Sequence, residues 1–123
     1  MVASYTSQGS ELGQDALVVG IDNLQSRSIT LVSGQTLKRG ALLGKITTGG
    51  KYTLSLSASS DGSQSPSVIL AEDCDASGGD KVTVAYFGGV FDENSVTFGT
   101  GHTAASAREA LRAVGIKLNS SIA

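Results

Sequence analysis

The sequence predicts a mainly β fold, a small barrel with one helix near the C-terminus and an extended arm at the N-terminus. Several short segments alternate apolar and polar residues, which is typical of strands. The chain has 123 residues, enough for one domain with a modest core. Hydrophobic residues make up 40% of it, but aromatic residues only 5%, and tryptophan is absent. The core must therefore be built from Leu, Val, Ile and Ala, which suits a small barrel.

Charge and composition exclude several classes of function. The formal net charge is -2, and no basic cluster marks a nucleic-acid interface. No apolar run is long enough to span a bilayer, and the N-terminus lacks the features of a signal peptide. The single cysteine, Cys74, excludes an intramolecular disulfide. We expect a soluble protein made in a reducing cytosol, with no nucleic-acid or membrane partner.

The first segment of the chain lacks a clear pattern. Residues 1–14 are rich in Ser, Thr, Gln and Gly and show neither helical nor strand periodicity. Residues 16–21 are apolar and β-prone but have no obvious partner strand. They could form a first core strand after a floppy terminus, or part of an arm that pairs with a neighbour's sheet edge. Both interpretations hold together if residues 1–14 are the arm and residues 16–21 its anchor.

The next strands follow in close succession. Residues 28–32 alternate apolar and polar through Leu31, and a turn at Ser33-Gly34 follows. Residues 41–46 and 51–57 are predicted to form a hairpin, joined by a turn whose two glycines can adopt a positive φ.

The second half of the chain contains shorter predicted strands. Residues 58–67 read as a polar loop, and residues 68–71 as a short buried strand. Residues 81–87 alternate clearly, and Gly88-Gly89 is expected to break that strand before an edge or bulge at residues 90–91. A turn at residues 92–95 and a brief strand at residues 96–98 complete this region.

One helix is predicted, over residues 104–114. Thr103 can serve as its N-cap, and Gly115 stands where a C′ glycine is expected. Its apolar face is formed by Ala107, Ala110, Leu111 and Val114. Residues 116–118 then resemble a last short strand.

The motifs that resemble known chemistry do not develop into sites. Residues 99–104 fit the G-x-G-x-x-A fingerprint of dinucleotide-binding proteins, but no second parallel strand follows. Cys74 lies between two aspartates, which disfavour a thiolate, and His102 is the only histidine. We therefore expect no catalytic, cofactor-binding or metal-ligating residues, and a function that comes from surface and assembly.

An ordered set of short motifs resembles one known family, the lambda D-type head decoration proteins of tailed phages. The set is Gly34-Gln35-x-Leu37-x-Arg39-Gly40-x-x-Leu43-Gly44-Lys45, Asp61-Gly62-Ser63-Gln64, Ile69-Leu70-Ala71-x-Asp73-x-Asp75-Ala76, Phe91-x-Glu93-Asn94 and Phe98-Gly99-x-Gly101 with the helix. The resemblance covers roughly residues 16–118.

The resemblance implies a capsid decoration, or cement, protein. It implies a β-clip-like fold and a homotrimer that binds the major capsid protein at three-fold and quasi-three-fold positions of the expanded head. It places the protein on the outer surface of the virion after synthesis in the host cytoplasm. It also implies an N-terminal segment that orders on the capsid by adding a strand to its sheet.

On this hypothesis residues 1–27 form the capsid-binding arm and residues 28–123 the trimerising body. The candidate apolar contacts of the arm are Tyr5, Leu12, Leu17, Val18 and Val19. The alternative is a small β-clip or lipoyl-like binding module of a larger enzyme or carrier system. Lys51 is then the nearest candidate for a carrier lysine, although its flanks lack the usual acidic or methionine neighbours.

Overall fold

The structure of the protein is a computed structural model that describes residues 17–119, apart from the side chains of residues 20–23. Its strands are β1 (Val18–Leu31), β2 (Thr36–Leu37), β3 (Leu42–Lys45), β4 (Tyr52–Leu54), β5 (Pro66–Leu70), β6 (Cys74–Asp75), β7 (Lys81–Asp92) and β8 (Ile116–Asn119). The helices are a 3₁₀ turn, η1 (Glu93–Ser95), and α2 (Ala104–Arg112).

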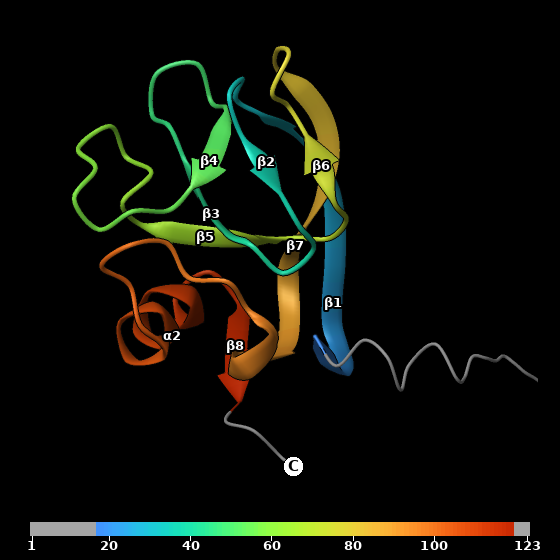
Figure 1. Ribbon diagram of the computed structural model, residues 1–123. Helices are drawn as coiled ribbons and strands as arrows, with labels where there is room; N and C mark the ends of the chain where they lie inside the picture. The colour runs from blue at the N-terminus through green and yellow to red at the C-terminus, as the bar shows by residue number, and fades with distance from the viewer. Residues whose placement is uncertain (1–16, 120–123) are drawn as a thin grey trace, which may run out of the picture.

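Five strands form a closed barrel. They follow the order β1, β4, β3, β5 and β7, and β7 pairs back with β1 to close the ring. β8 joins β7 in parallel, and β2 pairs with β6 as a separate two-stranded sheet (Figure 1). The prediction of a mainly β fold with a small barrel and one C-terminal helix is confirmed.

The core lies on both sides of the barrel wall. Val68 and Leu70 belong to one buried cluster, while Ile69 between them belongs to another that includes Leu111 of α2 and Ile116 of β8. Because side chains alternate along a strand, the first cluster fills the barrel and the second lies between its wall and α2 with β8. Burial on both faces explains why β5 reads as a continuous apolar run rather than an alternating one.

β1 is longer than the sequence indicated. The polar residues between positions 22 and 28 separated two predicted segments, but β1 runs through them as a single strand of 14 residues. It pairs with β7 from Val18 opposite Phe91 to Leu31 opposite Lys81, with irregular register around Gln25. The polar residues from Gln25 to Ser28 are accommodated in the strand because they are exposed. The predicted boundary between residues 27 and 28 falls inside this strand.

β7 also continues where a break was predicted. It spans 12 residues through Gly88-Gly89, and Gly89 has φ of 141°. A Cβ at Gly89 would lie 2.9 Å from the side chain of Leu24 in β1, so the glycine permits close approach of the two strands. In the first half of β7, Thr83 and Ala85 face inward, and Val82 is 69% exposed.

The predicted hairpin is confirmed in a shorter form. β3 and β4 pair antiparallel, with Leu43 opposite Leu54. The turn contains Gly49 and Gly50 with φ of 92° and 74°, as the turn type requires. The predicted strand at residues 96–98 is reduced to one isolated bridge between Ala41 and Thr97.

α2 has the predicted N-cap and ends two residues earlier than predicted. The Thr103 side chain accepts from the N–H of Ser106, and the Ser106 hydroxyl accepts from the N–H of Thr103, which completes a capping box. Gly115 has φ of 92°, consistent with a C′ glycine. Val114 was predicted on the apolar face, but it lies beyond the helix and is 45% exposed.

Gly44 marks a close approach between the barrel and the loop at residues 58–65. A Cβ at Gly44 would lie 2.0 Å from the carbonyl oxygen of Ser63. Ser63 is fully buried, and its carbonyl also accepts from the Ser55 hydroxyl at 2.7 Å. The loop therefore cannot move outward without losing a buried hydrogen bond.

We predict that Gly44→Ala lowers the free energy of unfolding by about 1–3 kcal/mol or more, because the new methyl group collides with backbone. Denaturant unfolding measures the effect. Gly78→Ala is the matched control, since a Cβ there meets nothing within 4 Å and should change stability by no more than about 0.5 kcal/mol. Equal stability of the two variants would contradict the close approach.

Two surface carboxylates tie turns together at one end of the barrel. The Asp75 carboxylate accepts from the N–H of Ser77 at 2.9 Å and from the hydroxyl of Thr36 at 3.2 Å. The Asp80 carboxylate pairs with Lys51 and accepts from a backbone N–H. Hydrogen bonds from Ser77 lower the pKa of Asp75, and the hydrogen bond from Lys51 lowers the pKa of Asp80.

We predict that stability declines as the pH falls from about 5 to 3. A carboxyl whose pKa is lower in the folded than in the unfolded state stabilises the fold above the unfolded pKa, and this contribution disappears when both states are protonated. The urea midpoint at a series of pH values measures the decline. Asp75→Asn/Asp80→Asn should flatten it, because the amide oxygen still accepts hydrogen bonds but does not titrate. An identical slope in both proteins would refute the assignment.

Candidate functional site

The five predicted arm contacts differ in where they lie. Tyr5 and Leu12 lie outside the described residues. Leu17 is 2% exposed and belongs to the cluster beneath α2 and β8, Val18 is half-buried against that cluster, and Val19 is 36% exposed. As the structure places it, the side chain of Leu17 packs inside the body. Contact of any of these residues with a capsid remains a prediction.

The start of β1 is held firmly to the body. The Leu17 carbonyl accepts from the N–H of Asp92 at 2.9 Å, immediately before the first β1–β7 pair, Val18 opposite Phe91. Phe91 is fully buried and also lies opposite Leu118 of β8. The segment that precedes Leu17 therefore joins the body at the end where β7 and β8 finish.

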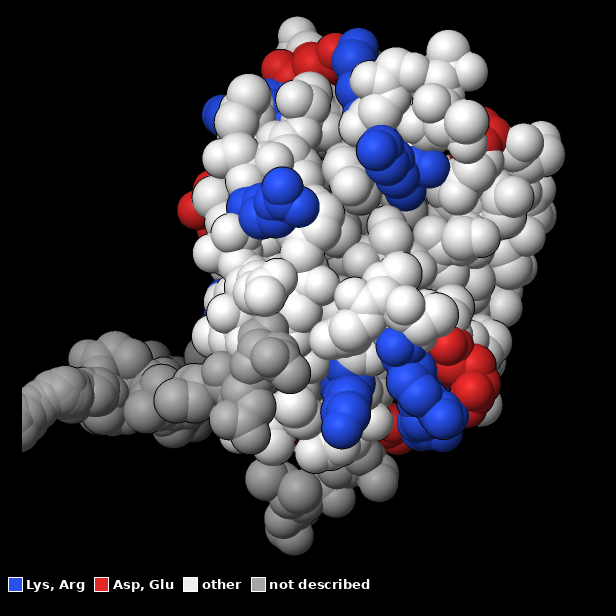
Figure 2. Space-filling view, turned by 180° about the vertical axis from the view of Figure 1, so that it is seen from behind, with Lys and Arg blue, Asp and Glu red and all other residues white. Residues whose placement is uncertain are grey.

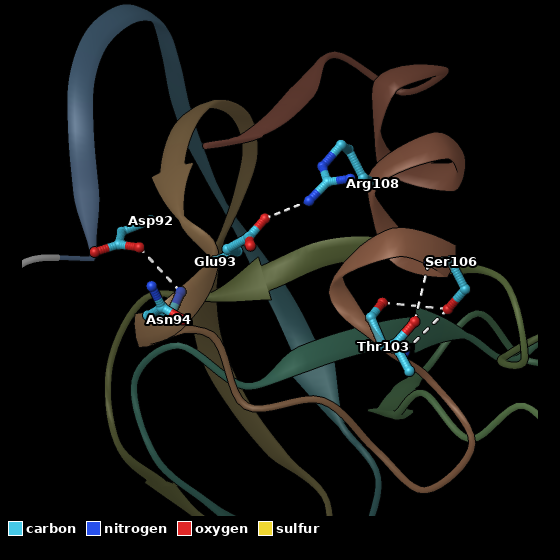
Figure 3. Close-up of polar contacts among 6 residues, drawn as sticks. All are labelled: Asp92, Glu93, Asn94, Thr103, Ser106 and Arg108. Atoms are coloured by element: carbon cyan, nitrogen blue, oxygen red, sulfur yellow. Dashed lines mark hydrogen bonds and ion pairs between the residues drawn. The ribbon is translucent and has the colours of Figure 1, made fainter. Parts of the chain in front are cut away.

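A polar cluster follows at the same end of the barrel. The Asp92 carboxylate accepts from the N–H of Asn94 at 2.9 Å and so caps η1. Next to it, the Glu93 carboxylate binds the guanidinium of Arg108 in α2 at 2.6 Å (Figure 3). Glu93 is 16% exposed and Arg108 41%, so the pair is partly shielded from water. This ion pair fixes α2 to the end of β7.

A hollow of about 320 Å³ opens beside this cluster. It is lined by Arg108, Arg112, Lys117, Leu118 and Asn119. Figure 2 shows basic side chains gathered at the lower end of one face, next to acidic ones. We call the five residues that line this hollow, Arg108, Arg112, Lys117, Leu118 and Asn119, the basic hollow.

Sequence reasoning missed the basic hollow. The sequence contains no run of basic residues, because two of the three cations belong to α2 and the third belongs to β8. Two signals were present: Arg108 and Arg112 are one helical turn apart, and Lys117 occupies an exposed position of a strand whose alternate residues are buried. What the sequence could not supply was the placement of α2 beside β8.

Arg39 connects segments of the chain that are far apart in the sequence. Its guanidinium donates to the carbonyl of Ala71 at 2.7 Å and to the hydroxyl of Tyr86 at 2.8 Å, and it also lies over the Tyr86 ring. Its backbone N–H donates to the carboxylate of Asp73 at 2.8 Å. Arg39, Ala71 and Asp73 all belong to the motif set, so those motifs reflect contacts between loops that are distant in sequence.

His102 joins the loop at residues 58–65 to the segment before α2. Its Nε2 lies 3.0 Å from the carbonyl of Gln64 and 3.1 Å from the hydroxyl of Ser55. Ser55 is fully buried and donates its own proton to the Ser63 carbonyl, so this serine–histidine contact is enclosed in the packing. Within residues 17–119 no group of three or more His, Cys, Asp or Glu side chains could hold a metal ion.

The glycines of the dinucleotide-like motif have a structural explanation. A Cβ at Gly99 would lie 2.0 Å from the carbonyl oxygen of Ser55, and Gly101 has φ of 89°. Close backbone approach and a turn into α2 account for both residues. No helix in the described part of the chain is long and apolar enough to cross a membrane.

Comparison with known proteins gives the family. The chain matches the family model for bacteriophage lambda head decoration protein D over residues 7–116. A comparison with curated protein sequences gives no match. Proteins of this family are structural components of the phage head. The match spans the barrel, α2 and the first residue of β8, and with the fold described above it shows that the chain belongs to the lambda head decoration protein D family, whose place is on the head of the virion.

Proposed function

We propose that the protein binds the expanded head of a tailed phage as a homotrimer, at three-fold and quasi-three-fold positions of the major capsid protein, and stabilises it. The observation that carries this proposal is the family match over residues 7–116. The match includes residues 7–16, which are part of the segment before β1. A protein that binds only the expanded shell stabilises that state by the difference in affinity.

The geometry of β1 explains how an arm could transmit such binding. Leu17 is buried, and its carbonyl accepts a hydrogen bond from the N–H of Asp92. A force on the preceding residues is therefore transmitted to the barrel through these contacts. In a homotrimer three such arms act together. Once one arm is bound, the other two bind at high effective concentration, so individually weak contacts add to a tight attachment.

We propose residues 1–16 as the part of the arm that adds a strand to the capsid sheet, with Tyr5 and Leu12 as apolar contacts and Val18 and Val19 beside them. Leu17 would have to leave the core to touch the shell, so we propose it as the anchor of the arm. β1 continues without interruption across residues 27 and 28, so the arm and the body share this strand.

The carrier-module alternative has less support. Lys51 lies just before β4, after the glycine turn, where a carrier lysine would stand, but its ammonium group pairs with Asp80. The family to which the chain belongs favours the decoration role.

Deletion of residues 1–14 tests the arm. We expect the truncated protein to remain trimeric, because the barrel is complete without these residues, and to bind expanded heads at least about 100-fold more weakly. Co-sedimentation with expanded and unexpanded heads gives the affinity, and sedimentation velocity gives the oligomer mass. Binding of the truncated protein at full strength would defeat the arm assignment.

Substitution within a full-length arm separates its chemistry from its length. Tyr5→Ser/Leu12→Ser should weaken binding to expanded heads by roughly tenfold or more, because two apolar side chains are lost from each arm. Ser7→Ala/Ser10→Ala is the matched control and should bind like the unchanged protein. If both double variants bind alike in the same co-sedimentation assay, Tyr5 and Leu12 are not the contacts.

A further inference from the structure

We propose that the basic hollow binds carboxylate side chains of an acidic segment on the shell protein, as a second contact beside the arm. This inference rests on the proposed function, because it identifies the partner as the surface to which the arm attaches. It adds a site that is formed by the folded body.

The cations of the basic hollow are arranged to receive a ligand. Arg108 is oriented by Glu93 through one of its guanidinium nitrogens, and Arg112 by Glu109 in the same way. A guanidinium has five donors, so each arginine keeps further N–H groups for another acceptor. Lys117 makes no ion pair with any residue between 17 and 119. Three cationic groups from two elements thus line one hollow of about 320 Å³.

The charge of the hollow favours carboxylates over a phosphate chain. Three cations and the two glutamates that orient them leave a net charge of +1. That balance suits one or two carboxylates, whereas tight binding of a nucleic-acid backbone requires many uncompensated cations. Leu118, which is only 5% exposed, and Asn119 complete the lining. The chain as a whole carries a net charge of -2, so a distributed attraction to nucleic acid is also missing.

The position of the hollow connects it with the arm. Phe91 lies opposite Val18 in β1 on one side and opposite Leu118 in β8 on the other. Asn119, which lines the hollow, lies opposite Asp92, whose N–H binds the Leu17 carbonyl. The arm and the hollow therefore share one end of the body, and a shell surface that holds the arm faces the hollow as well.

Charge-matched variants of the full-length protein test the inference. Arg112→Gln/Lys117→Gln removes two cations from the hollow, while Lys38→Gln/Lys81→Gln removes two exposed cations elsewhere. Lys81 lies opposite Leu31, at the far end of the β1–β7 pair from Val18. Both variants have the same net charge, so a difference between them reflects where the cations lie. Thermal unfolding checks that both remain folded.

Binding to expanded heads is measured at low and at physiological salt. We expect the hollow variant to bind at least about tenfold more weakly than the control at low salt, since a loss of about threefold per subunit is multiplied over three subunits. Its affinity should also depend less on salt. Equal affinity and equal salt dependence of the two variants would overturn the inference.

A titration without heads separates this inference from the proposed function. A peptide of about eight glutamates is added to the isotope-labelled protein, and amide shifts are followed by NMR. We expect amide shifts centred on residues 116–119. The affinity for the peptide obtained from them should be about fivefold weaker in the hollow variant and unchanged in the control. Shifts elsewhere, no shifts, or tighter binding of an oligothymidine of equal charge would reject a carboxylate site. If the unchanged protein failed to bind heads, the proposed function would fall, and the titration would still decide the chemistry of the hollow.

Discussion

The pairing of β1 with β7 is the constraint on which the rest of the structure depends. β1 and β7 are the two longest strands, and their antiparallel ladder closes the barrel. A closed barrel leaves no free edge among its own strands, which protects a small β protein from pairing with the wrong partner. The cost is that both strands must bend round the ring. Gly89 and the register shifts near Gln25 accommodate that bend.

The same ladder connects packing with function. It begins at Val18 opposite Phe91, where the buried Leu17 side chain and the Asp92–Leu17 hydrogen bond fix the point at which the N-terminal segment joins the body. Phe91 also lies opposite Leu118 in β8, and α2 packs against β8. The end of one strand pair thus positions an arm attachment and a basic hollow within the same part of the molecule. In the proposed function this arrangement is an advantage, because several modest contacts to one surface add to a tight attachment.

Most conspicuous sequence motifs have structural explanations. Gly44 and Gly99 are glycines because backbone carbonyls lie where a Cβ would be. Arg39 and His102 hold together loops that are far apart in sequence. The family resemblance therefore rests largely on residues that maintain the barrel and its loops. The residues proposed to touch the shell form no recognisable sequence motif, because exposed contact residues need neither the regular spacing of core residues nor the residue types that turns require.

The sequence by itself determined the class of fold, the hairpin between β3 and β4, the helix with its Thr103 cap, and the family. Each depends on local signals, namely alternation, turn glycines, capping residues and an ordered set of motifs. Only the tertiary structure decided that β1 and β7 run unbroken, because pairing along a whole strand outweighs the local polarity of residues 22–28 and the glycines at 88–89. It also decided that Leu17 is a core residue and that cations from α2 and β8 meet in one hollow. Both results arise from contacts between segments far apart in the chain, which periodicity along a sequence does not encode.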